Sequence, residues 1–291
     1  MQETVFTTKK QSQLKQIWKQ FRKNKAAMVG LVIISLLLLI AIFADVIVDY
    51  DTVVIAQNSS ERMQAPSGAH WFGTDNYGRD IFARVIHGAR MSLTIGIVTT
   101  IISVFFGGVL GALAGFYGGK VDNIISRVMD ALICIPATLM ALCIIAALGT
   151  GLVNIMIAIT VSQIPGFTRL IRSVIMTLRD QDYIEAARSC GTSDFRIITK
   201  HIIPNALGPI IVQGTMAMAD MILTAAGLGF LGMGIAPPAP EWGTMLSEGR
   251  EFIRTAPYII TFPGVAIVLT ALSFNMLGDG LRDALDPRLK D

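Results

Sequence analysis

The sequence is poor in charged residues. Asp, Glu, Lys and Arg make up 15% of its 291 residues, whereas soluble proteins average about 25%. The net charge is only +3, and no long block of like charge follows the N-terminal segment, so a nucleic-acid partner is not indicated. Hydrophobic residues reach 53% and the mean hydropathy is +0.59. This composition favours a membrane protein.

Cysteines, histidines and catalytic motifs are equally scarce. The three cysteines, Cys134, Cys143 and Cys190, form no C-x-x-C pair, so structural disulfides and zinc are not expected. The three histidines lie far apart and show no metal-ligand spacing. The sequence has no G-x-S-x-G, no H-E-x-x-H and no G-x-x-x-x-G-K-[ST] phosphate loop. We therefore expect no catalytic residue, no metal and no cofactor, and no ATP hydrolysis by this chain.

Two glycine patterns invite other interpretations. GLGFLG at 227–232 matches the dinucleotide motif, but it ends an apolar run and does not link a strand to a helix. Close helix packing or a helix exit fits it better. Gly107, Gly111 and Gly115 are spaced by four and share one helix face, which lets another backbone approach closely. Intramolecular packing is favoured here, with a subunit interface as the alternative.

Long charge-free runs predict a bundle of membrane helices. A spanning helix needs about 20 mainly apolar residues. We predict an all-α polytopic protein with six spans. These are 26–44, 91–119, two antiparallel spans within 131–168 that are separated at Gly149-Thr150-Gly151, one centred on 209–230, and 255–278.

Basic residues orient the predicted bundle. The first 25 residues hold seven Lys and Arg against one acid, Glu3, so this end is expected in the cytoplasm. Six spans then place both termini inside. The inside segments hold 18 Lys and Arg and the outside segments six. We interpret the first span as an uncleaved anchor, because its apolar run is longer than a signal peptide's and an A-x-A cleavage pattern is missing.

The predicted organisation has five parts. They are a basic amphipathic N-terminal segment (1–25), the first transmembrane helix (26–44), an extracytoplasmic loop (45–90), a five-helix core (91–282) with a cytoplasmic loop at 182–205, and a cytoplasmic tail (283–291). In the first part Leu14, Ile17, Trp18 and Phe21 recur at helical spacing. This pattern predicts an amphipathic helix on the inner membrane surface.

Asp220 is the one ionisable residue inside a predicted span. Because a charge in the membrane is costly, such a residue often marks an ion or substrate path. Three hypotheses fit: Asp220 lines a translocation path, it pairs with another helix, or it serves a proton-coupled secondary transporter. Proton relays usually present more than one such group, which makes the third hypothesis remote.

Residues 185–205, EAARSCGTSDFRIITKHIIPN, form a polar break between two apolar runs. We expect a short helix from Glu185 that ends at Gly191, because glycine adopts the left-handed conformation that closes helices. A second helix should follow, with Asp194 favourable in its first turn. Phe195, Ile198 and Ile202 form its predicted apolar stripe against the protein.

Pro204 is expected to stop this second helix before the next span begins. The helix pair has two possible uses. It can pack on its own bundle, or it can dock into a groove of a partner, for which the small residues beside Glu185 are suited. A partner that moves the pair would also move the two adjoining spans.

The segment resembles the "EAA" signature of ABC-importer membrane subunits, E-A-A-x3-G-x9-I-x-L-P. The matching positions are Glu185, Ala186, Ala187, Gly191 and Pro204, whereas His201 replaces the Ile and Ile203 the Leu. Three further stretches resemble the peptide and nickel branch of that family: HWFGTDNYGRDIFARVIHGARMSL, GFLGMGIAPPAPEWGTML and FNMLGDGLRDALDPRLKD. With the basic leader, the resemblance covers nearly the whole chain and is to the C-type permeases.

This resemblance implies a type I importer permease in the bacterial inner membrane. The implied partners are a homologous second permease, two cytoplasmic ATP-binding subunits and an extracytoplasmic substrate-binding protein. The loop at 185–204 would be the ATPase-coupling element, with Glu185, Ala186, Ala187, Gly191, Asp194 and Pro204 as its residues. Dipeptides or short oligopeptides are the expected cargo, and nickel or glutathione the alternatives.

Overall fold

The computed structural model describes residues 13–285, and within this range the chain is helical, with one isolated bridge between Thr74 and Asp80 and no strand. Residues 1–12 and 286–291, which belong to the predicted N-terminal segment and tail, lie outside the described residues. The α-helices are α1 (Gln13–Phe21), α2 (Lys25–Ile42), α3 (Ala44–Ile47), α4 (Ile81–Tyr117), α5 (Gly119–Ile133), α6 (Ala137–Leu148), α7 (Leu152–Arg179), α8 (Asp182–Ser189), α9 (Asp194–Ile197), α10 (Ile203–Leu228), α11 (Trp242–Gly249) and α12 (Tyr258–Leu285). Short 3₁₀ or π segments are η1 (Tyr50–Val54), η2 (Ser59–Glu61), η3 (Ile198–Ile202), η4 (Gly229–Met233) and η5 (Arg250–Phe252).

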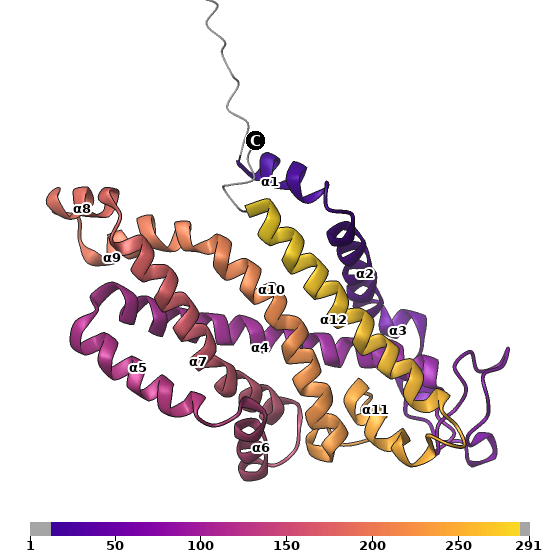
Figure 1. Cartoon of the computed structure of the whole chain (residues 1–291). Coiled ribbons are helices and arrows are strands. Elements are labelled where there is room, and N and C mark those ends of the chain that lie inside the picture. Colours follow the sequence, from indigo (N-terminus) through magenta and orange to yellow (C-terminus); the bar gives the residue numbers. More distant parts are fainter. Residues whose placement is uncertain (1–12, 286–291) are drawn as a thin grey trace, which may run out of the picture.

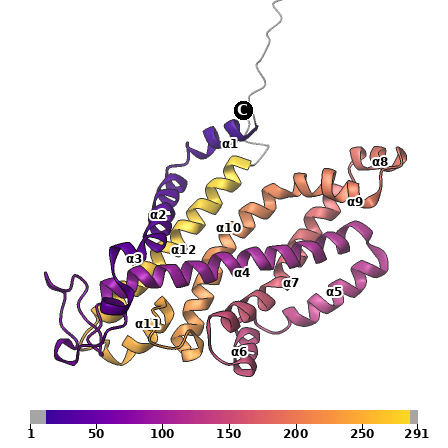
Figure 2. The same cartoon turned by 180° about the vertical axis from the view of Figure 1, so that it is seen from behind.

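The 37-residue helix α4 forms the middle of the bundle. It packs most extensively on α7 and also contacts α2 and α10, while α12 packs on both α2 and α10. The helices α1, α8 and α9 and the last turns of α12 lie at one end, here called the α8 end (Figures 1 and 2). Helices α6 and α11 lie at the opposite end, here called the α11 end.

The predicted all-α polytopic membrane fold is confirmed. Within residues 13–285, four stretches are long and apolar enough to cross a membrane, namely 25–42, 81–117, 194–233 and 258–285. The pair α5–α6, bent by 84°, adds a fifth if it is one span. Helix α7 is 28 residues long but more polar and is not among them. The count of six spans and the inside position of both termini stay predictions.

Two predicted span boundaries need correction. Helix α4 begins at Ile81 and not at Met91, because Arg84 and Arg90 bond to acidic partners and continue the helix. The expected third span is divided at Pro136, which disfavours helical backbone at the residue before it. Only 12 residues remain for α6, too few to cross alone. The predicted turn at 149–151 is confirmed between α6 and α7.

Pro204 does not stop the helix, contrary to the prediction. Residues 194–233 form one continuous helical stretch, and Pro204 lies in the first turn of α10. The π-helical segment η3 precedes it, and Ile203 N–H donates to Ile198 O, five residues back. This wider turn accommodates Pro204, whose backbone nitrogen has no hydrogen to donate, without ending the helix.

The predicted N-terminal amphipathic helix is confirmed as α1, which packs on the last turns of α12. Phe21 is buried there with Ala27 and Ala284, whereas Trp18 on the same helix is exposed. The apolar side of α1 therefore contacts protein in part and is open in part.

The glycines spaced by four serve intramolecular packing, as favoured from the sequence. A Cβ atom on Gly111 would lie 2.7 Å from Thr168 O, and one on Gly115 would lie 2.8 Å from Arg172 O. Both oxygens belong to the backbone of α7. The glycine face thus lets α4 and α7 touch backbone to backbone over several turns.

Candidate functional site

Helices α8 and α9 meet at Gly191, which has the predicted left-handed conformation (φ +74°). Gly191 N–H donates to Arg188 O at 2.9 Å, and Thr192 N–H donates to Ala187 O at 3.1 Å. This pair of bonds is a Schellman motif, which satisfies the last carbonyls of a helix. The local sequence therefore fixes the angle at which the chain leaves α8.

One face of this helix pair is anchored in the bundle. Ile184, Ile197 and Ile202 are fully buried in a cluster that includes Phe116 of α4 and Ile171 of α7. The predicted stripe is confirmed at Ile202, which is buried, and at Ile198, which packs partly buried on the same cluster. It is wrong at Phe195, which is 77% exposed, because Ile197 is buried instead. The change from α9 to the π turn η3 rotates the inward face away from the expected α-helical spacing.

The other face is open. The residues predicted for coupling lie mostly on it: Glu185, Ala186, Gly191, Asp194 and Pro204 are exposed, and Ala187 is half-buried. Cys190, at the turn between the helices, is exposed as well. No Cβ atom on Gly191 would meet any other atom within 4 Å. The turn therefore has free space around it for a partner.

A set of polar contacts connects the helix pair to the end of α4. The Arg188 guanidinium lies over the Phe116 ring, 5.1 Å from its centroid. Arg179, at the end of α7, donates to Gly115 O at 3.0 Å. A displacement of α8 would thus reach α4 directly and not only through the chain.

Asp220 lies on the open face of α10. Its side chain is exposed and, in the part of the chain that the structure describes, accepts no hydrogen bond and joins no ion pair. The hypothesis that it pairs with another helix of this chain therefore finds no partner within residues 13–285.

At the α11 end, four charged residues form a buried cluster. The Arg79 Nε donates to Asp75 Oδ2 at 2.6 Å, and Arg79 Nη2 donates to Glu248 Oε2 at 2.7 Å. Arg84 Nη2 donates to the same Glu248 oxygen at 3.1 Å, and Arg84 Nη1 to Pro238 O at 3.1 Å. Two cations and two anions balance, so the cluster joins the loop before α4 to α11 without a net charge.

Glu241 begins α11 next to this cluster. Its carboxylate accepts from Gly243 N and Thr244 N, both at 2.8 Å, and from Ser92 Oγ of α4 at 3.3 Å. Burial raises the pKa of Glu241, and the bonds to these N–H groups oppose the rise. The side chain is an N-cap that also holds α11 against α4.

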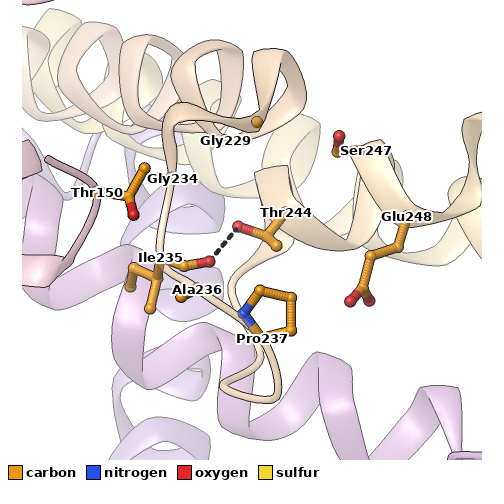
Figure 3. A pocket seen from close by; sticks show the side chains of 10 residues that line it. Thr150, Gly229, Gly234, Ile235, Ala236, Pro237, Thr244, Ser247 and Glu248 are labelled. Atoms are coloured by element: carbon orange, nitrogen blue, oxygen red, sulfur yellow. Dashed lines mark hydrogen bonds between the residues drawn. The ribbon is translucent and has the colours of Figure 1, made fainter. Parts of the chain in front are cut away.

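A cavity of about 280 Å³ lies at the same end. Thr150 of the turn between α6 and α7 lines one side, and Thr244 and Glu248 of α11 line the other (Figure 3). Thr244 Oγ1 donates to Ile235 O across the loop that follows η4. The cavity offers hydroxyls, a carbonyl and one carboxylate, and it contains no group of metal ligands.

The described residues contain no cluster of three His, Cys, Asp or Glu side chains that could hold a metal ion.

Sequence reasoning missed the cluster of Arg79, Arg84 and Glu248. A signal was available, since Asp75 and Arg79 lie four apart in a polar stretch. The contact with Glu248, however, joins positions 169 residues apart in the chain, and no local pattern shows it.

These features define a polytopic helical membrane protein with an anchored, open helix pair at one end. Residues 107–291 match the family described as binding-protein-dependent transport system inner membrane component. Residues 12–66 match the N-terminal TM domain of oligopeptide transport permease C.

Curated relatives span almost the whole chain. The dipeptide transport system permease protein DppC of Alkalihalophilus pseudofirmus is 49% identical over 276 residues, which cover 95% of this chain and 90% of the relative. The glutathione transport system permease protein GsiD of Pectobacterium atrosepticum is 43% identical, with coverage of 95% and 91%. The di/tripeptide transport system permease protein DppC of Pseudomonas aeruginosa is 41% identical, with coverage of 96% and 94%.

A solved structure of the MetNI methionine ABC transporter, in an inward-facing conformation, shares the fold. Its TM-score is 0.58 at 18% identity, over 71% of this chain and 98% of that chain. The chain therefore belongs to the family of binding-protein-dependent transport system inner membrane components. It is an ABC transport permease of the inner membrane, as the resemblance in its sequence implied.

Proposed function

We propose that this chain is one of two permease subunits of an ATP-driven importer of dipeptides or short oligopeptides. The dipeptide and di/tripeptide permeases among its relatives support this cargo. Glutathione, itself a small peptide, is the second candidate, because relatives named for it are 43–45% identical. The extracytoplasmic binding protein would select among these cargoes.

The observation that carries the proposal is the helix pair α8–α9. Its inner face is buried through Ile184 and Ile197, and its outer face, with Glu185 and Ala186, is open. An element that is firmly attached on one side and free on the other suits the transfer of movement from a partner. We assign the exposed residues Glu185, Ala186, Gly191, Asp194 and Pro204, together with the half-buried Ala187, to contact with an ATP-binding subunit.

The energy would come from other chains. This chain would hold no cofactor and carry no catalytic group, and two ATP-binding subunits would hydrolyse ATP in the cytoplasm. The movement would pass from α8 through Arg188 and Phe116 into α4. A homologous second permease would complete the translocation path, which Asp220 would line. The binding protein would meet the α11 end, where the cluster around Glu248 joins the predicted extracytoplasmic loop 45–90 to α11.

The proposal predicts that the ATP-binding subunits co-purify with this chain. It also predicts that peptide uptake stops when ATP is depleted at constant membrane potential. Uptake that continued without ATP but followed the proton gradient would instead support a secondary transporter. Uptake of glutathione and not of dipeptides by the same assembly would replace the cargo while leaving the importer class unchanged.

A further inference from the structure

Asp220 is a charge for which residues 13–285 supply no counter-ion. It lies in the helical stretch 194–233, 13 residues before its end. At 1.5 Å per residue this distance is about 20 Å, more than half of a hydrocarbon core of roughly 30 Å. A short Asp side chain cannot reach the membrane surface from that depth, so its carboxylate needs water or a cation beside it.

The face of α10 around Asp220 is unlike a lipid-facing surface. Going along the helix by steps of three and four, this face presents Gln213, Met216, Asp220, Thr224 and Gly227, all at least partly exposed, and beside them Leu223, which is 46% exposed. The exposed positions of α2 are by contrast mostly aliphatic, with Val29, Val32, Leu36 and Leu39. A mixed face with a carboxylate, an amide and a hydroxyl on one membrane helix and a mostly aliphatic face on another indicate different surroundings.

The same face has room for a ligand. A Cβ atom on Gly227 would meet nothing within 4 Å. The Gln213 amide, two turns from Asp220, makes no hydrogen bond within residues 13–285. One carboxylate and one amide about 10 Å apart along the helix can serve a small molecule that carries a cationic group and several peptide bonds.

We propose that Asp220 binds the α-ammonium group of the peptide as it passes through the membrane, with Gln213 as a second polar contact. A free peptide carries this cation near neutral pH, because the α-amino pKa is about 8. Charge complementarity favours this ammonium group as the bound group, because the face around Asp220 carries one anion and no cation within the described span. The inference rests on the proposed peptide import and adds which group of the peptide the translocation path would bind.

The test uses the complete transporter in proteoliposomes, with a radiolabelled dipeptide and its binding protein. Asp220→Glu should retain most uptake. Asp220→Asn should lower it by about tenfold, the loss expected when about 1.4 kcal/mol of charge interaction is removed. Asp220→Lys should lower it further. Binding-protein-stimulated ATP hydrolysis should remain in all three variants, because the coupling element is far from Asp220.

The control is Asp279→Asn, which removes another exposed acid close to the inner end of α12 and should leave uptake unchanged. Wild-type uptake by Asp220→Asn would overturn the inference while the proposed function stands. Loss of the second permease on purification of Asp220→Asn would also overturn it, since the carboxylate would then be an interface contact. If the wild-type assembly imports no peptide at all, the proposed function itself fails.

Discussion

The cluster of Asp75, Arg79, Arg84 and Glu248 allows a prediction with a matched control. Glu248→Gln keeps the shape of the side chain but removes the charge that faces two guanidinium groups, both 1% exposed. Asp75 would remain as the single anion for both. Breaking a buried ion pair on one side costs about 3–5 kcal/mol, and because the Glu248 side chain is 15% exposed we expect the lower value, about 3 kcal/mol.

Asp130→Asn provides the control. Its carboxylate meets Arg169 Nη2 at 2.7 Å, the same separation as Arg79 Nη2 and Glu248 Oε2. The Arg169 and Asp130 side chains, however, are 58% and 56% exposed. Exposed pairs contribute about 0–1 kcal/mol because water and salt screen them. Two pairs with equal geometry should thus differ severalfold in their effect on stability.

The assay is the temperature at which the assembled transporter loses its monodisperse peak on fluorescence-detected size exclusion. A loss of 1 kcal/mol lowers a melting temperature by about 2–4 °C in proteins of 150–250 residues. We therefore expect a decrease of roughly 6–12 °C for Glu248→Gln and below about 4 °C for Asp130→Asn. High salt should abolish the smaller effect only. Equal decreases for the two variants would refute the reasoning.

Three further predictions concern backbone contacts and a buried acid. Gly111→Leu should prevent stable folding, because even a Cβ atom would lie 2.7 Å from Thr168 O. The control Gly166→Ala should fold, because a Cβ atom there would meet nothing within 4 Å. The yield of monodisperse protein measures both effects. Gly191→Asn should keep wild-type uptake, because asparagine tolerates positive φ. Gly191→Val should lose most of the uptake while the protein is still inserted in the membrane. Equal uptake by both variants would contradict the left-handed turn. Burial raises the pKa of Glu241 in the folded state. The folded protein therefore binds the Glu241 proton more tightly than the unfolded chain does. The resulting contribution to stability is present at low pH and is lost as pH rises through the folded pKa. The melting temperature of the wild type relative to Glu241→Gln should therefore rise as pH is lowered, and a difference that does not change with pH would be evidence against that shift.

Much of the helical plan follows from composition and local pattern. The apolar runs, the turn at 149–151 and the left-handed Gly191 each depend on residues close in sequence, and the structure has them. The Schellman bonds around Gly191 explain why such a short segment is predictable, since all their atoms lie within six residues. The open position of Glu185 and Ala186 also follows from small or charged residues on one side of a short helix.

The errors have a common physical cause. The sequence predicts Arg84 in the loop 45–90 because charge is costly in a membrane helix, yet Glu248, far along the chain, neutralises it. Regular α-helical spacing predicts Phe195 on the inward face, but the π turn before Pro204 changes which side chains face inward. Long-range ion pairs and departures from the 3.6-residue period depend on the folded environment, which local patterns do not contain.

The claim that α8–α9 contacts an ATP-binding subunit can be tested through Cys190, which is exposed at the turn. In a transporter with Cys134 and Cys143 changed to serine, a short cross-linker that attaches to the Cys190 thiol at one end and is photoreactive at the other should join Cys190 to an ATP-binding subunit from the cytoplasmic side. The yield should change when ATP is added, because the proposed coupling requires movement at this contact. Absence of any cross-link to that subunit, or modification of Cys190 by an impermeant thiol reagent from outside, would contradict the account.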